Sequence, residues 1–406
     1  MNNEKRTTKN IILLCLSLFT FHFSLFTVSA QIAVKGETVW TMAGEPIQNG
    51  VVLINRGKIE AVGTANQVKI PAGYRILIAK TVTPGLIDAH SVVGLAGYMN
   101  QPNDQMQVEN SSPMQPELRA MDAYNAEDRL IEWIRSFGVT TIHTGHAPAA
   151  LTSGQTMIAK TFGKSVEDAT ITTTAMIAVT LGESGLASGG KSPGTVSKAA
   201  AMLRAELIKA QSYGTKPDSP RDLRAEMWKK VLTGEIRLLV TAHKARDIMT
   251  ALRIAKEFNI KIVLDGASEA LTVINEIKAS GFPVIVHPTM YRAGGETESL
   301  SMETAAKLKQ AGILVALQSG YETYVPKTRV VLFEAAIAAS NGLSARDALA
   351  TVTIDAAKIL GIDNRVGSIE KGKDADLAMY DGDPFEYLTH CIGTIINGQV
   401  VSETIR

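Results

Sequence analysis

Short apolar runs alternate with amphipathic stretches through the middle of the chain. The apolar runs cover residues 85–90, 139–146, 155–161, 172–183, 236–243, 260–267, 282–289 and 312–320. Runs that are apolar throughout are typical of strands buried on both faces of a parallel sheet. Helix-like spacing fills most gaps, as in 118–136, 196–212, 244–258, 268–280 and 301–311. The alternation predicts an α/β fold, a (β/α)8 TIM barrel over residues 82–363.

The two ends of the chain have a different pattern, in which short strands are separated by turn residues. VVLIN (51–55) and KIEAVG (58–63) flank Arg56-Gly57 as a hairpin would. The same pattern returns near the C-terminus. Because both ends flank the barrel and share this pattern, we expect residues 31–81 and 364–406 to form one small β-sandwich domain together.

Residues 1–30 have the layout of a secretory signal peptide. Basic residues precede an apolar run over 11–28, and Val28-Ser29-Ala30 supplies small residues for cleavage before Gln31. A membrane anchor is the alternative, since the run is about long enough to span a bilayer. No basic stop follows Ala30, which favours cleavage. We therefore expect an exported, periplasmic protein with no stable membrane insertion after the signal is removed.

Charge and cysteine content narrow the range of partners. The chain carries 41 Lys and Arg against 40 Asp and Glu, so bulk electrostatics predict no nucleic-acid partner. Cleavage after Ala30 removes Cys15 and leaves Cys391 alone, which excludes an intrachain disulfide. A small-molecule substrate or ligand is the expected partner. Homo-oligomerisation, or pairing with an active relative, stays open.

Two long motifs lie at opposite ends of the predicted barrel: TVTPGLIDAH (81–90) and VGSIEKGKDADLAMYDGDP (366–384). Together with GKIEAVG (57–63), FGVTTIHTGH (137–146) and the segment 341–362, they resemble the metal-dependent amidohydrolase superfamily, in particular its imidazolonepropionase-like branch. The resemblance covers nearly all of the mature chain. It implies a TIM barrel, hydrolysis of C–N bonds, and one or two divalent metal ions at the C-terminal strand ends.

Most metal-ligand positions implied by this resemblance hold other residue types. The first histidine of the H-x-H pair after strand one maps to His90, and the carboxylate position after strand four falls near Glu183. The second histidine of the pair, the two later histidines and the final aspartate map to Val92, Thr241, Gly266 and Gly320. The loss of so many ligands together indicates a site rebuilt for another purpose.

Histidine and acidic side chains nevertheless gather at the predicted C-terminal strand ends, where active sites of such barrels lie. Our hypothesis gives His90 and His243 the role of ligands to one zinc ion, or leaves the site without metal. The predicted catalytic residues are Asp265, Glu183 and His287, and the predicted pocket residues are Thr241, Gly320, His143 and His146. A structural role, such as bonding to a carbonyl or capping a loop, is the alternative for each polar member.

Two functions remain open from the sequence. The first is a hydrolase that cleaves a C–N bond in a small amide, cyclic amide or dipeptide-like substrate, with a reduced or rewired metal site. The second is a catalytically inactive pseudoenzyme that binds a ligand or a partner subunit. The barrel and tail motifs are intact, which favours a retained binding function in either case.

Overall fold

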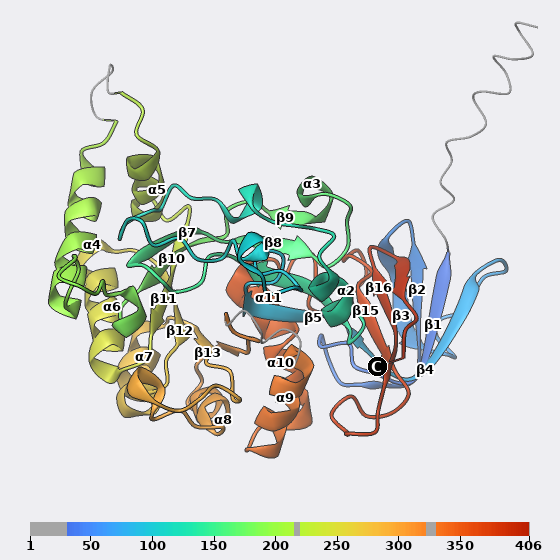
Figure 1. Ribbon diagram of the computed structural model, residues 1–406. Coiled ribbons are helices and arrows are strands. Elements are labelled where there is room, and N and C mark those ends of the chain that lie inside the picture. The colour runs from blue at the N-terminus through green and yellow to red at the C-terminus, as the bar shows by residue number, and fades with distance from the viewer. Residues whose placement is uncertain (1–30, 215–219, 322–329, 406) are drawn as a thin grey trace, which may run out of the picture.

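The computed structural model describes residues 31–214, 220–321 and 330–405 (Figure 1). The predicted signal peptide lies outside these residues. Within the described ranges, no helix combines the length and the apolar character that a membrane crossing requires.

Strands from both ends of the chain form one seven-stranded sheet. The N-terminal part supplies β1 (Ile32–Val39), β2 (Ile47–Asn55), β3 (Lys58–Thr64) and β4 (Arg75–Pro84), and the C-terminal part supplies β15 (Leu377–Tyr380), β16 (Cys391–Ile396) and β17 (Gln399–Ser402). Their order is β17-β16-β15-β4-β1-β2-β3. The ends meet where β15 pairs antiparallel with β4, and Figure 1 shows the blue and red strands side by side. The ends thus share a sheet, as expected, but a two-sheet sandwich is not confirmed.

The middle of the chain forms two further sheets. The six-stranded sheet runs in the order β14 (Val315–Ala316), β13 (Val284–Val286), β12 (Ile262–Gly266), β11 (Arg237–Ala242), β10 (Met176–Thr180) and β7 (Thr152–Gln155). The four-stranded sheet runs in the order β5 (Leu86–Ser91), β6 (Val139–Thr144), β8 (Met157–Lys160) and β9 (Thr170–Thr172). Only Thr156 separates β7 from β8, and Ser91 bridges to Gly320 beyond β14. The sheets thus meet on both sides in a barrel-like arrangement.

One expected strand runs in the wrong direction for a barrel of eight parallel strands. The predicted third strand is the β7–β8 segment, and it pairs antiparallel with β6 on one side and with β10 on the other. A parallel crossover needs about a dozen residues or more, with a helix in most cases. The connection over 145–151 is too short for that, and the chain after β8 forms only the four-residue α3 (Val166–Ala169). The prediction of eight parallel strands is therefore wrong for this strand.

Helices cover the outside of these strands (Figure 1). They are α2 (Arg129–Arg135), α4 (Val196–Gln211), α5 (Leu223–Leu232), α6 (Ala245–Phe258), α7 (Ile274–Ser280), α8 (Thr304–Gln310), α9 (Val331–Ser340), α10 (Ala345–Thr351) and α11 (Ile354–Leu360). The helix expected over 118–136 begins only at Arg129, where the side chain of Asp128 caps it by accepting from the Leu130 amide. The preceding residues form a bridge between Arg119 and Gln155, a short 3-10 helix (Ala120–Asp122) and turns instead.

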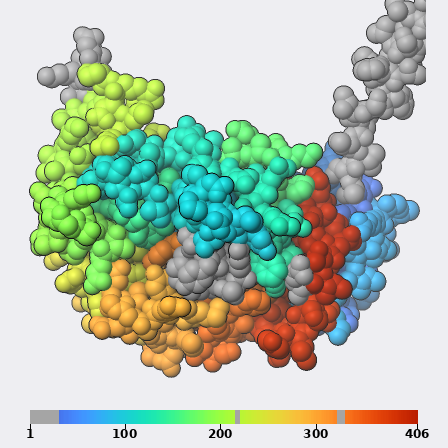
Figure 2. All heavy atoms as spheres, in the orientation of Figure 1, coloured from blue at the N-terminus to red at the C-terminus, as the bar shows by residue number. Residues whose placement is uncertain are grey.

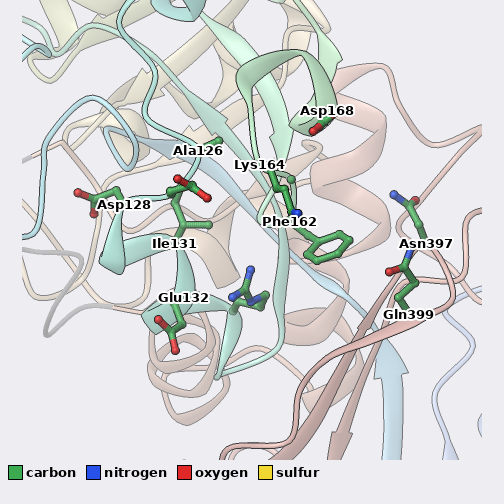
Figure 3. A pocket seen from close by; sticks show the side chains of 12 residues that line it. Ala126, Asp128, Ile131, Glu132, Phe162, Lys164, Asp168, Asn397 and Gln399 are labelled. Atoms are coloured by element: carbon green, nitrogen blue, oxygen red, sulfur yellow. The ribbon is translucent and has the colours of Figure 1, made fainter.

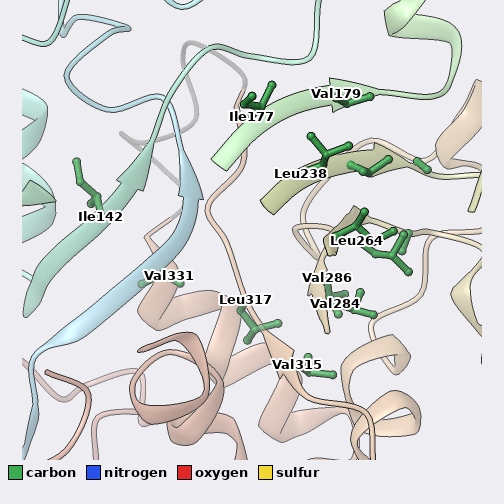
Figure 4. Close-up of a cluster of buried hydrophobic side chains, with 14 of the residues drawn as sticks. Ile142, Ile177, Val179, Leu238, Leu264, Val284, Val286, Val315, Leu317 and Val331 are labelled. Carbon is green, nitrogen blue, oxygen red and sulfur yellow. The ribbon is translucent and has the colours of Figure 1, made fainter. Parts of the chain in front are cut away.

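Alternating strand residues divide the core into two layers. Leu238 and Leu264 join a cluster between the strands and the helices, which Figure 4 shows together with Val331 of α9. Their neighbours Leu239 and Val263 belong to a separate inner cluster. Because residues two apart in a strand face the same way, the next inward positions are occupied by Thr241 on β11 and Asp265 on β12. The strand periodicity thus places polar side chains above an apolar barrel floor.

A buried ion network joins the barrel to the seven-stranded sheet. Lys160, at the end of β8, contacts the carboxylates of Asp374 and Asp376, and all three side chains are nearly fully buried. Both aspartates belong to the KDADL motif near the C-terminus. Asp374 also accepts from Lys58 and Arg365, whose side chains are about half exposed. Lys160 is therefore the buried counter-charge for a motif far away in the sequence.

We expect Lys160→Met to lower the free energy of unfolding by about 3–5 kcal/mol, because it leaves two buried carboxylates without their shared cation. Lys58→Met is the matched control, since it removes a half-exposed partner of the same Asp374 and should cost about 0–1 kcal/mol. Urea denaturation measures both. Equal, small losses in the two variants would contradict the role given to Lys160.

Candidate functional site

The carboxylate of Asp265 holds together the polar end of the barrel interior. One oxygen, Oδ1, accepts from His90 Nδ1 at 3.0 Å and from Gln318 Nε2 at 2.8 Å. The other, Oδ2, accepts from Thr241 Oγ1 at 2.7 Å, across the β11–β12 pair. All four side chains are buried. An ionised carboxylate can only accept, so the proton of this His90–Asp265 bond lies on Nδ1.

Electrostatics favour the charged form of both members of this pair. Burial alone lowers the pKa of His90, but the carboxylates of Asp265 and Asp88 outweigh it, and the pKa is raised. Burial raises the pKa of Asp265, but His90 and the hydrogen bonds from Thr241 and Gln318 outweigh it, and the pKa is lowered. The pair therefore resembles an internal ion pair rather than two neutral groups.

Asp88 supports the pair from below. Its Oδ1 accepts from the Ser319 amide at 3.0 Å, and its carboxylate also contacts the Ser319 hydroxyl. Burial raises its pKa to about 6 against these hydrogen bonds. Asp88 thus ties the end of β5 to the segment after β14.

Two of the side chains that bind Asp265 each have one further polar atom without a hydrogen-bond partner among the described residues. They are Nε2 of His90 and Oε1 of Gln318, and both are buried. A buried polar atom without a hydrogen bond costs about 1–3 kcal/mol. One ring nitrogen and one amide oxygen are therefore left without a hydrogen bond on the two side chains that bind Asp265 Oδ1. A protonated Nε2 would donate, a neutral one would accept, and Oε1 accepts.

His143 lies deeper in the barrel and has both ring nitrogens engaged. Nδ1 contacts the Ala89 carbonyl and Nε2 the Thr156 hydroxyl, each at 2.7 Å. Its ring centre lies 5.9 Å from that of His90. Burial, with the nearby charge of His90, lowers its pKa to about 3. His143 is therefore neutral and links β5, β6 and the β7–β8 segment beneath the pair.

His243 follows β11 and occupies the space that a side chain at position 266 would need. Its Nδ1 contacts Ser268 Oγ at 2.8 Å and its Nε2 contacts the Tyr321 hydroxyl at 3.3 Å. A Cβ on Gly266 would lie 2.6 Å from His243 Cε1, and Gly266 has a φ of +78°. Burial lowers the pKa of His243. The glycine thus makes room for the imidazole as well as for the backbone turn.

The second position of the first-strand motif is part of an apolar wall. Val92 is fully buried with Ala96 and Ala147, and Tyr321 packs against this group. The Tyr321 ring also lies 5.7 Å from the ring of His90. A hydrocarbon surface therefore stands where the resemblance implies a metal-ligating histidine.

The described residues do not fit a bound divalent metal. In the described ranges, no three His, Cys, Asp or Glu side chains are grouped so that they could hold an ion. His90 Nδ1 is committed to Asp265, and both nitrogens of His243 contact hydroxyl groups. The geometry therefore does not support the prediction that His90 and His243 share a zinc ion.

The other predicted site residues lie apart from the pair. His287 contacts the Pro288 carbonyl and the Thr304 hydroxyl, and burial lowers its pKa to about 4. Both of its nitrogens fix local structure, which does not support a catalytic role. Glu183 is exposed, and its amide donates to Glu296. The other two predicted catalytic residues, His287 and Glu183, therefore do not hydrogen-bond to Asp265.

His146 and Gly320 both follow barrel strands at their C-terminal ends, and they differ in their contacts. His146 is buried in the loop after β6, and neither ring nitrogen has a partner among the described residues. Gly320 has a φ of +94° and its amide donates to the His90 carbonyl at 3.4 Å. Figure 2 shows the loop after β5 in light blue and cyan on the face of the molecule turned toward the viewer.

Sequence reasoning missed Gln318 and Tyr321. Gln318 lies near the end of the eighth apolar run and Tyr321 directly follows it, whereas the prediction named only Gly320 between them. The sequence feature that could have indicated Gln318 is its position two residues before Gly320, where the resemblance implies an aspartate. A neutral amide that donates to Asp265 is what a site without that aspartate would need.

Gly266→Ala should displace the His243 ring, and it should destabilise the protein by more than the backbone strain of a left-handed alanine alone would. Gly234→Ala is the matched control, because Gly234 has a similar φ of +75° with no atom within 4 Å of an added Cβ. Each variant pays about 1–2 kcal/mol for a left-handed backbone. Gly266→Ala should lose about 1 kcal/mol more, for the hydrogen bond to Ser268. Thermal unfolding measures the difference, and equal losses would show that His243 does not depend on the glycine.

Comparison with known proteins places this chain in a family. The amidohydrolase family model matches residues 114–402. An amidohydrolase from Thermotoga maritima MSB8 is 30% identical, with a TM-score of 0.86 over 92% of this chain and 100% of that one. A zinc-bound adenosine deaminase from Xanthomonas campestris shares the fold at 12% identity, with a TM-score of 0.53 over 91% of this chain and 92% of that one.

A curated relative matches over a short segment. Imidazolonepropionase from Shewanella frigidimarina is 47% identical over 66 residues, which are 15% of this chain and only 16% of that protein. The longer matches decide the assignment, and they agree with the barrel-like α/β arrangement of the strands. The chain belongs to the amidohydrolase family.

Proposed function

We propose that the chain hydrolyses a C–N bond in a small amide, cyclic amide or dipeptide-like substrate, using the His90–Asp265 pair in place of the usual metal centre. The observation that carries this proposal is the unpartnered Nε2 of a buried imidazole whose other nitrogen is fixed by a carboxylate. This arrangement orients a histidine as a general base and stabilises the imidazolium that forms. Because residues 1–30 have the layout of a signal peptide, we propose that this activity takes place in the periplasm.

The pair can move the proton that hydrolysis requires. The neutral form of His90, which is populated once the pH rises above its raised pKa, accepts a proton at Nε2 from the attacking water, whose hydroxyl group adds to the substrate carbonyl carbon. The imidazolium, held by Asp265, then returns that proton to the leaving nitrogen as the C–N bond breaks. The free Oε1 of Gln318 is suited to accept an N–H of the substrate amide. Water is consumed and no other reactant is needed.

A second function has a specific observation in its favour. Val92 forms part of an apolar wall. The ring nitrogens of His143, His243 and His287 contact other groups of the protein. A pocket stabilised in this way suits a protein that binds an amide-type ligand without cleaving it. The two functions share the ligand class and differ only in turnover.

His90→Gln and Asp265→Asn should each lower kcat/KM for a cleaved amide by about 10²–10⁴-fold, the range for loss of general acid–base catalysis. The measurement is amine release from a panel of small amides, cyclic amides and dipeptides. His390→Gln is the control, since His390 is exposed and pairs with Asp381 in the seven-stranded sheet region. Turnover that survives in both site variants would refute the proposed role of the pair. A wild-type chain that cleaves nothing but is thermally stabilised by a panel member would support the second function.

The contribution of the pair to stability should depend on pH. The pKa of His90 is raised above its ordinary 6.5, so its contribution is complete below pH 6.5 and is lost as the pH rises through the folded value. The pKa of Asp265 is lowered below its ordinary 3.8, so its contribution is complete above pH 3.8 and is lost as the pH falls through the folded value. The unfolding free energy of the wild type should therefore exceed that of His90→Gln most between pH 3.8 and 6.5, by about 1.5–3 kcal/mol. Urea denaturation across pH 4–9 tests this, and a difference that grows above pH 7 would contradict it.

A further inference from the structure

A pocket lies at the seam between the barrel and the seven-stranded sheet. It has a volume of about 490 Å³ and is lined by α2, the segment after β8 and the turn between β16 and β17. Figure 3 shows Ile131 and Glu132 on one side, Asn397 and Gln399 on the other, and Phe162 between them. Pockets that bind small molecules have volumes of about 300–1,000 Å³. This one is large enough for a small organic ligand.

The pocket is separate from the His90–Asp265 site. Arg135, one of its lining residues, ends α2 just before β6 begins. His90 lies near the C-terminal end of β5, and β5 and β6 run parallel. Arg135 therefore lies at the opposite end of these strands from His90. None of the residues that line this pocket contacts the Asp265 carboxylate.

The charge of the Glu132 carboxylate acts on the guanidinium of Arg135 and partly offsets the effect of burial on its pKa, but the two groups form no ion pair in the described part of the chain. Arg135 Nη1 donates to the Thr161 carbonyl at 2.8 Å, and its Nε is buried without an acceptor in the described part of the chain. No salt bridge involves Arg135 within those residues. Burial lowers the pKa of this arginine. A partly desolvated guanidinium is costly to leave unpaired, and its planar geometry suits a carboxylate.

The rest of the lining carries charges of both signs. Lys164 lies in the pocket without an ion-pair partner among the described residues, and Figure 3 shows it near Phe162. Glu127, Glu132 and Asp168 are exposed carboxylates that likewise form no salt bridge within the described ranges. Asp128 differs, because its carboxylate accepts from the Leu130 and Tyr98 amides. A simple anion would meet the guanidinium but also face several carboxylates.

We propose that this pocket binds a small zwitterion of the amino-acid type, with its carboxylate against Arg135 and Lys164 and its ammonium group against Glu132 or Asp168. The side-chain amides of Asn397 and Gln399 complete the polar contacts, and Phe162 and Ile131 provide an apolar surface for the ligand side chain. Such a ligand satisfies both charge types at once. It would also bridge α2 of the barrel and the β16–β17 turn of the sheet.

The test is calorimetric titration of the whole mature chain with L-leucine and two half-molecules. The half-molecules are 4-methylpentanoate, which lacks the ammonium group, and isopentylamine, which lacks the carboxylate. L-leucine should bind, and each half-molecule should bind at least about tenfold more weakly, the loss for one charge-assisted hydrogen bond. Absence of binding by L-leucine, or equal binding by 4-methylpentanoate, would overturn the proposal.

Variants locate the binding. Arg135→Gln should weaken L-leucine binding by about tenfold or more. Arg129→Gln is the matched control, because Arg129 is on the same helix but stacks on Tyr98 outside the pocket. The exposed Lys164→Gln gives a second reading if Arg135→Gln does not fold. Unchanged affinity in Lys164→Gln and in a folded Arg135→Gln would overturn the assignment to this pocket.

Discussion

The arrangement of the site depends on one buried carboxylate. Asp265 lies in the barrel interior, where an isolated charge would be strongly unfavourable. Three donors meet it there, from β5, β11 and the segment after β14. Because those donors come from far-apart segments, the same interaction that neutralises Asp265 also fixes how the strand ends are arranged. Removing any one donor would leave the charge less well compensated.

The neighbouring residues are consistent with a site rebuilt as a unit. Gly266 leaves the space that the His243 ring occupies, and Val92 gives Tyr321 an apolar surface to pack against. His143 links three strands beneath the pair while remaining neutral. Together they leave Nε2 of His90 as the ring nitrogen of the pair that can meet a ligand.

Patterns along the chain predicted much of the fold and less of the site. Continuous apolar runs identified the strands, and matching turn-rich ends identified the shared sheet, because these signals are local. The reversed β7–β8 segment was missed because strand direction depends on connections and neighbours rather than on the composition of the strand. His90 and Asp265 were both singled out, but not as partners, since their contact joins residues 175 positions apart. The contact of His287 with Thr304 was not foreseen, because Thr304 begins a helix that follows it in the chain.

The most direct test of a site without the usual metal centre is elemental analysis of the mature protein, purified without chelators or a His-tag, soaked with zinc and then desalted. The arrangement around Asp265 predicts far less than one zinc, iron or manganese ion per chain. About one ion or more per chain, lost in His90→Gln, would contradict the assignment of His90 to Asp265 and restore a metal to the site.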